Sequence, residues 1–175
     1  GAADMHKRQL EAFSVERVTK QFYKTYHDLF KHVLGVIREQ NPGAIIQSGP
    51  ERRIPAVGAE ATDDERRALH AFTQRLLGRL LFLYFIQKKG WLQGREHYIT
   101  ELYESTVQAG GNFYRDALEP LYFETLNTPV IPGTKRGIPY LNGSLFEREY
   151  PDTTVFNLPN SLFDPRNAGN GAGDP

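Results

Sequence analysis

Residues 62–90 read TDDERRALHAFTQRLLGRLLFLYFIQKKG, and this stretch decides the fold. Its opening Thr-Asp-Asp-Glu is a capping box that also sets acidic groups against the positive end of a helix dipole. Apolar residues then recur every three or four positions and later cover most sides of the helix, which is typical of a central, nearly buried element. Lys88 and Lys89 complement the negative end, and Gly90 supplies the stop. The stretch predicts one long helix from Thr62 to Lys89.

A second periodic segment precedes this helix, from about Ser14 to Arg38. Its apolar stripe consists of Val15, Val18, Phe22, Tyr26, Leu29, Val33 and Ile37. Ser14 is placed to act as its N-cap, and Asn41-Pro42-Gly43 ends it. Residues 99–108 and 114–127 predict two shorter helices separated by Gly110-Gly111, with Pro120 kinking or restarting the second. We expect a mainly α fold with two long amphipathic helices and two or more shorter ones.

The remaining segments are rich in proline and glycine. Residues 41–62 predict a long loop with room for a short hairpin, and residues 128–163 predict irregular chain with room for short strands. Residues 164–175 have the composition of a flexible tail or linker. Gly1-Ala2-Ala3 resembles the remnant of a cloning tag. The predicted organisation is an N-terminal lead over 1–12, a helical domain over 13–163 and a tail over 164–175.

Composition limits the function. The 21 basic residues equal the 21 acidic ones, so binding to nucleic acid would need a local basic patch. The absence of cysteine excludes disulfides, thiolate zinc sites and cysteine nucleophiles, and it favours the cytoplasm. No apolar run approaches the roughly 20 residues that cross a bilayer, so we expect no membrane partner.

The chain carries no complete catalytic motif. A restriction-type nuclease core needs an acidic residue two positions before a lysine, and none of the lysines has one. The Asn-Pro-Pro-aromatic motif that holds a target adenine is absent, because Asn41-Pro42 is followed by Gly43. Residues 164–171 resemble the loop that binds S-adenosylmethionine, but they lack the flanking strand and helix that would aim backbone amides at a cofactor. We expect no catalytic, cofactor or metal site within this chain.

Three motifs, in their order and spacing, resemble one family. They are FSVERVTKQFY at residues 13–23, RLLFLYFIQKKGWL at residues 79–92 and PYLNGSLFE at residues 139–147. They are similar to the helical segment that precedes the methyltransferase domain in adenine-specific DNA methyltransferases. That family includes type IIG restriction-modification enzymes and related phage-defence methylases. The resemblance spans most of residues 13–163.

The resemblance implies a non-catalytic connector that couples domains and contacts the DNA backbone. Its partners would be DNA and a methyltransferase domain in the same polypeptide, and the parent enzyme would use S-adenosylmethionine. Six basic residues are the candidates for facing phosphate: Arg52, Arg53, Lys88, Lys89, Lys135 and Arg136. The loop with Tyr140, Asn142 and Gly143 is either a structural turn or a surface docked on the methyltransferase domain. Ser144 stands where the family usually has a second glycine, which disfavours a left-handed backbone there.

Structural roles explain much of the same pattern. Residues 80–86 are most simply core, Trp91 packs beside the helix end, and the two lysines at 88 and 89 complement the dipole. The alternative function is a free-standing helical module that docks a protein partner through exposed helix faces. The coding sequence downstream of Pro175 discriminates between them, because only a connector would be followed by a methyltransferase domain.

Overall fold

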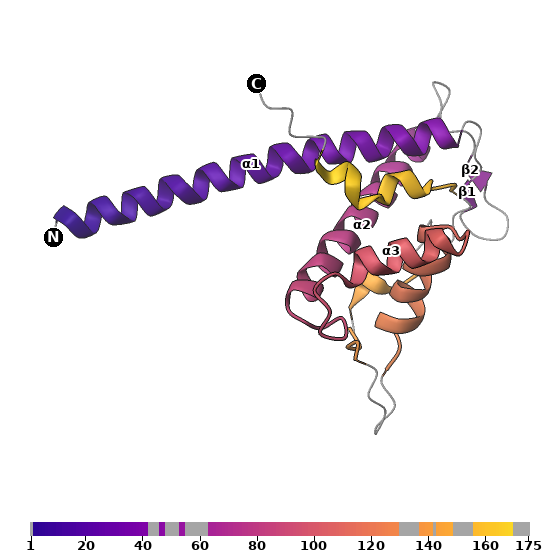
Figure 1. The fold of residues 1–175 in the computed structure, drawn as a ribbon. Helices are drawn as coiled ribbons and strands as arrows, with labels where there is room; N and C mark the ends of the chain where they lie inside the picture. Colours follow the sequence, from indigo (N-terminus) through magenta and orange to yellow (C-terminus); the bar gives the residue numbers. More distant parts are fainter. Residues whose placement is uncertain are drawn as a thin grey trace.

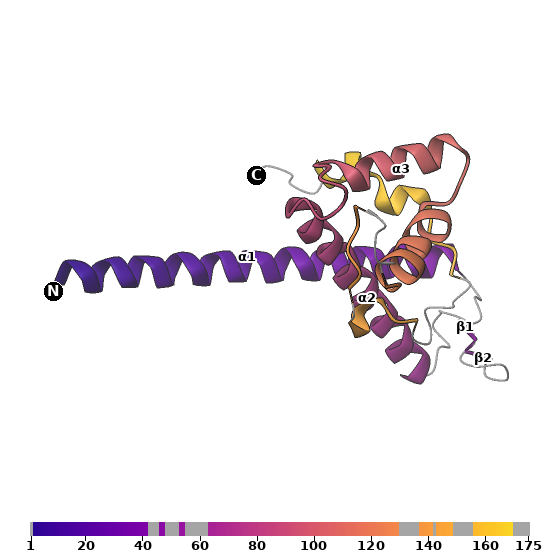
Figure 2. The same ribbon diagram turned by 90° about the horizontal axis from the view of Figure 1, so that it is seen from below.

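Two long helices form the frame of the structure. The computed structural model describes residues 2–41, 46–47, 53–54, 63–129, 137–141, 143–148 and 156–169, and it describes side-chain surroundings for most of these from Thr19 onward. Helix α1 spans Ala2–Gln40 and helix α2 spans Asp63–Lys88. The C-terminal half of α1 packs on α2 through buried Val33, Leu34 and Ile37, whereas its N-terminal half projects away from the body (Figures 1 and 2). The prediction of a mainly α fold is confirmed.

The predicted start of the first helix is wrong. α1 begins at Ala2, about three turns before the predicted N-cap at Ser14. Residues 2–13 contain no glycine or proline and are mostly strong helix formers, so nothing in them interrupts the helix. The predicted lead over 1–12 is therefore helical from Ala2. The bounds predicted for α2 agree with the structure to within one residue.

The shorter helices follow α2 along the chain. Helix α3 spans Tyr98–Gln108, and the segment predicted as a helix at 114–127 contains two π-helical parts, η1 at Phe113–Leu118 and η2 at Leu121–Leu126. Between them, residues 119–120 continue the helical path, so Pro120 stands at the point where the second part starts. A proline has no backbone N–H to donate to the preceding turn, which accounts for a restart at this position.

The segments rich in proline and glycine are only partly described. Strand β1, Ile46–Gln47, pairs antiparallel with strand β2, Arg53–Ile54, which matches the short hairpin expected within residues 41–62. The described residues after 137 form short 3₁₀ helices and no strand: η3 at Ser144–Phe146, η4 at Asn160–Phe163 and η5 at Pro165–Gly169. η5 lies within the segment predicted as a tail, where the Asp164 carboxylate accepts a hydrogen bond from the Arg166 backbone N–H at 3.0 Å.

α2 forms the centre of the hydrophobic core. Its buried apolar residues include Leu69, Phe72, Leu76, Leu77, Leu83 and Ile86. The C-terminal segment closes this core, because Phe156 packs against Phe72 with ring centroids 5.0 Å apart. Within the described part of the chain, no helix is both long and apolar enough to cross a membrane.

Candidate functional site

A buried arginine joins the second and third sequence motifs. Arg79 of α2 is only 1% exposed, and its guanidinium donates hydrogen bonds to the backbone carbonyls of Leu145 at 2.6 Å and Glu147 at 3.0 Å. A buried charge is tolerated only when its donors are satisfied, so this side chain fixes where the loop of residues 143–148 lies on α2. We call this contact the Arg79 lock.

Aromatic rings surround the Arg79 lock. The guanidinium carbon lies 5.0 Å from the ring centroid of Phe123 and 5.6 Å from that of Tyr122, both on η2. Phe146, from the locked loop, contacts the Tyr122 ring at 5.7 Å between centroids. Burial raises the pKa of the Tyr122 hydroxyl well above its usual range. The lock therefore ties α2, η2 and the loop into one packed unit.

Two further hydrogen bonds hold the turn after α2. The Gln87 side-chain oxygen accepts the backbone N–H of Ile99 at 2.8 Å and so caps the start of α3, whose own N-cap residue makes no side-chain cap. The Gln93 backbone N–H donates to the carbonyl of Gly137 at 2.7 Å, which joins this turn to the segment leading into the third motif. Gly137 has a φ of 68°, a conformation that glycine adopts without strain.

The phosphate-facing candidates are only partly placed by the structure. Lys88 and Lys89 are exposed at the end of α2, and the Lys89 ammonium lies 5.6 Å from the Phe85 ring centroid. The backbone of Arg53 is in strand β2, whereas Arg52, Lys135 and Arg136 lie outside the described residues. The structure brings only Lys88 and Lys89 together, so a shared surface for all six residues stays a prediction.

The predicted docking loop is also partly described. Tyr140 is half-buried, Asn142 lies outside the described residues, and Gly143 has an extended backbone with a φ of −161°. Ser144 starts the 3₁₀ helix η3, so neither position needs the left-handed conformation that a glycine would favour. Leu141 donates its backbone N–H to the carbonyl of Leu126 at 2.8 Å. The loop is thus held by main-chain contacts, which leaves docking on another domain a prediction.

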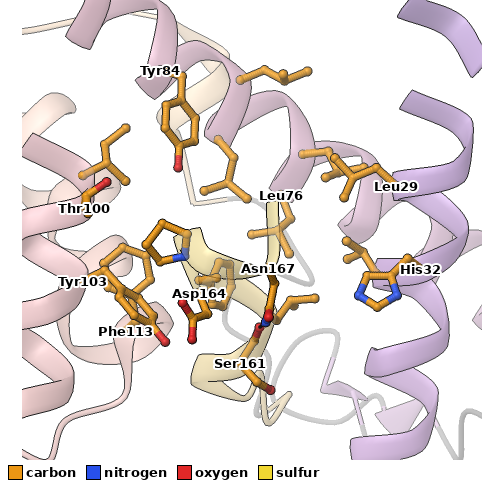
Figure 3. A pocket seen from close by; sticks show the side chains of 18 residues that line it. Leu29, His32, Leu76, Tyr84, Thr100, Tyr103, Phe113, Ser161, Asp164 and Asn167 are labelled. Atoms are coloured by element: carbon orange, nitrogen blue, oxygen red, sulfur yellow. Dashed lines mark hydrogen bonds between the residues drawn. The ribbon is translucent and has the colours of Figure 1, made fainter. Parts of the chain in front are cut away.

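An apolar groove of about 260 Å³ lies between α1, α2, α3 and the C-terminal 3₁₀ helices (Figure 3). Leu29 and His32 line it from α1, Leu76 and Tyr84 line it from α2, and Asp164 lines it from the C-terminal segment. The pKa of Asp164 is lowered by its side-chain hydrogen bonds from Arg166. This carboxylate is therefore already paired within the C-terminal segment. Among the described residues, no group of three His, Cys, Asp or Glu side chains is placed to hold a metal ion.

Exposed apolar side chains gather at the C-terminal end of α2. They are Leu81, Tyr84, Phe85 and, just after the helix, Trp91, each between 43% and 51% exposed. We call them the α2-end patch. Trp91 was expected to pack beside the helix end, yet about half of it faces solvent. Such a patch is typical of a surface that another protein or domain covers.

The sequence pattern contains a signal for the buried position of Arg79. Leu76, Arg79, Leu83 and Ile86 follow the three- and four-residue spacing of the buried face of α2, so a cation stands on an apolar stripe. A charge at such a position predicts a partner elsewhere in the chain. Gln87 gave no comparable signal, because its role depends on where α3 begins.

Two comparisons with known proteins agree with the resemblance read from the motifs. Residues 71–146 match the family model described as "MmeI, helicase spacer domain". A protein of Methanocaldococcus jannaschii, whose name describes a type II restriction enzyme and methyltransferase, is 26% identical over 160 residues, which is 84% of this chain. The chain covers 13% of that protein's length. No solved structure matches the chain.

Proposed function

This chain is related to a helical segment of type II restriction-modification enzymes, and from that premise we propose that it is a non-catalytic connector within such an enzyme. In this role it couples the domains on either side and supports a methyltransferase domain in the same polypeptide. S-adenosylmethionine and the reacting adenine belong to that neighbouring domain. DNA is the partner of the whole enzyme, which works in the cytoplasm.

The Arg79 lock is the observation that carries this proposal. The region that matches the spacer model begins in α2 and ends at Phe146, inside the locked loop. The lock joins the two ends of that region through one buried side chain. A unit whose ends are held together can transmit the position of one neighbour to the other, which is what a connector has to do.

The exposed features also support a connector. The α2-end patch presents apolar side chains that an adjoining domain would remove from water, a gain of about 25 cal/mol per Å².

The first test is binding between this chain and the methyltransferase domain encoded next to it, each produced separately and mixed in a calorimeter. We expect a complex, and we expect Phe85→Ser with Trp91→Ser to weaken it at least tenfold, because these side chains lie in the α2-end patch. Val107→Ser is the matched control, since Val107 is 38% exposed on α3, outside the patch. Absence of any complex contradicts the proposal.

A free-standing interaction module is the second candidate, and the same patch favours it. The two candidates differ in what the coding sequence contains. A connector is followed by a strand, a glycine-rich loop and an Asn-Pro-Pro-aromatic motif, whereas an independent module is not. A complete coding sequence without these elements would replace the first proposal with the second.

A further inference from the structure

The basic residues of α1 lie on one face of the helix. Lys24, Lys31 and Arg38 are spaced by seven residues, and Lys20 and His27 fall four and three residues from Lys24. At 3.6 residues per turn, this spacing sets all of them on one side. All are exposed. We call this row, Lys20, Lys24, His27, Lys31 and Arg38, the α1 ridge.

The apolar stripe fixes which way the ridge faces. Leu34, Ile37 and Val33 are buried against the body, and on a helical projection Val33 lies roughly opposite Lys31 and Arg38, whereas Leu34 lies beside them. The ridge therefore runs along the solvent-exposed flank of the face that packs on α2. Figures 1 and 2 show the described body on one side of α1, so the opposite side is accessible along its length.

The ridge is long and consists of basic side chains. From Lys20 to Arg38 the helix rises about 27 Å, which matches roughly eight steps of 3.4 Å along a DNA strand. Among the described residues, Lys24, Lys31 and Arg38 form no ion pair. Asp28 lies on the flank of the ridge, 3.8 Å from the His27 ring nitrogen. In a chain with no net charge, this row is a local concentration of basic side chains.

We propose that the α1 ridge lies along the phosphate backbone of duplex DNA. The proposal rests on the connector function, because it assumes that DNA is the partner of the whole enzyme. It concerns a different set of residues from the six candidates that the sequence suggested, whose shared surface stays a prediction. A bilayer fits the same helix less well, because the apolar face that would enter the lipid is covered by α2 along its C-terminal half.

Salt-dependent binding to a 20-base-pair duplex tests the ridge directly. The logarithm of the affinity falls with the logarithm of salt concentration by about 0.9 for each phosphate contact. We therefore expect Lys24→Gln with Lys31→Gln to reduce this slope by about 1.8. Arg66→Gln with Arg95→Gln removes the same charge from exposed positions outside the ridge and should leave the slope unchanged. Circular dichroism of each variant checks that α1 remains helical.

Other outcomes overturn the inference in distinguishable ways. If Lys88→Gln with Lys89→Gln lowers the slope and the ridge variant does not, phosphate is bound at the end of α2. The connector proposal then stands and the ridge does not. Binding to phosphatidylserine vesicles but not to the duplex would assign the ridge to a membrane. Failure to bind the duplex at low salt overturns the ridge, while the binding test with the methyltransferase domain still decides the proposed function.

Discussion

Arg79 places a guanidinium inside the core, where an isolated charge would be costly. Its donors are directed at two carbonyls of the loop at residues 143–148, and its flat face lies near the rings of Phe123 and Tyr122. A lysine has a single compact head and does not reproduce this forked geometry. The role of Arg79 thus depends on its shape as well as its charge.

Replacing Arg79 should therefore destabilise the chain strongly. Arg79→Met keeps the apolar stem but leaves two carbonyls without their donor, at about 1–3 kcal/mol for each orphaned group. We expect Arg79→Lys to recover only part of this loss. Urea unfolding measures the free energy of unfolding. Arg95→Met is the control, because the ion pair between Arg95 and Glu101 is exposed and contributes little. Equal stability of Arg79→Met and the parent chain would contradict the Arg79 lock.

The carboxylate of Asp116 predicts a pH dependence. The side-chain hydrogen bond from Arg115, and then the one from the backbone N–H of Asn112, hold the pKa of Asp116 below its usual range. The folded pKa lies below the unfolded value of about 3.9, so the stabilisation is complete above that pH. It is lost as the pH falls through the lower, folded pKa.

Asp116→Asn should accordingly lower the melting temperature at neutral pH slightly, because its hydrogen bonds are exposed to solvent. The difference from the parent chain should shrink toward zero in strong acid, when the parent carboxyl is protonated too. Thermal unfolding followed by circular dichroism at a series of pH values measures it. Glu104→Gln, which removes an exposed carboxylate of α3, is the control. A difference in melting temperature that stays constant from neutral pH to strong acid would show that the charge of Asp116 does not stabilise the chain.

At the scale of elements, the C-terminal segment completes the core although it lies far along the sequence from α1 and α2. The Asn41 side chain at the end of α1 accepts the backbone N–H of Asn157 at 2.7 Å and donates to the Asn157 carbonyl at 3.0 Å. Asn160 exchanges similar bonds with the chain before η1, accepting from Phe113 and donating to Gly111. These side-chain amides bond to backbone groups of distant segments and so hold the C-terminal segment in place, as main-chain hydrogen bonds hold neighbouring strands in a sheet.

Asn41→Ala should weaken the attachment of the C-terminal segment to the end of α1 and lower the free energy of unfolding. Asn41 is 6% exposed, so its loss removes two part-buried hydrogen bonds to the Asn157 main chain, at about 0.5–1.5 kcal/mol for each. Asn157→Ala is a matched control, because it is the same chemical change at the other end of the link, where the described bonds use only the main chain. Hydrogen exchange of residues 156–163 and urea unfolding measure both variants. Equal effects of the two substitutions would contradict the role of the Asn41 side chain.

Local sequence signals predicted the helices well, but they did not predict how the C-terminal segment packs on the core. The capping box and the lysine-glycine end set the bounds of α2, because these signals act within one turn of the helix. The start of α1 was misplaced because Ser14 resembles an N-cap but the chain before it also favours a helix. The segment around Phe156 gave no periodic signal, since its place depends on contacts with Asn41 and Phe72 far away in sequence.

At the scale of the whole molecule, a packed body carries a long projecting helix. The body contains the region that matches the spacer model, and α1 extends beyond it with Phe22 and Tyr23 more than half exposed (Figure 1). The motif at residues 13–23 lies on this projecting part. The body and the helix therefore offer separate surfaces, one for a neighbouring domain at the α2-end patch and one for DNA at the α1 ridge.

The candidate site was less predictable than the fold. Motif order pointed to the class of enzyme that the spacer model and the Methanocaldococcus jannaschii relative also indicate. Single basic residues carry no such periodic constraint unless they share a helix face, as Lys24, Lys31 and Arg38 do. The exposure of this row on α1 became known only from the structure, in which the neighbouring face with Leu34 and Ile37 is buried.

The connector role is tested most directly by methylation in a split enzyme. The methyltransferase domain that the proposal expects in the same polypeptide is produced alone, and incorporation of methyl groups from S-adenosylmethionine into duplex DNA is measured with and without the 175-residue chain. The connector account predicts low methylation by the domain alone, recovery when the chain is added, and a weaker recovery with Phe85→Ser and Trp91→Ser. Full methylation by the domain alone, unchanged when the chain is added, would contradict it.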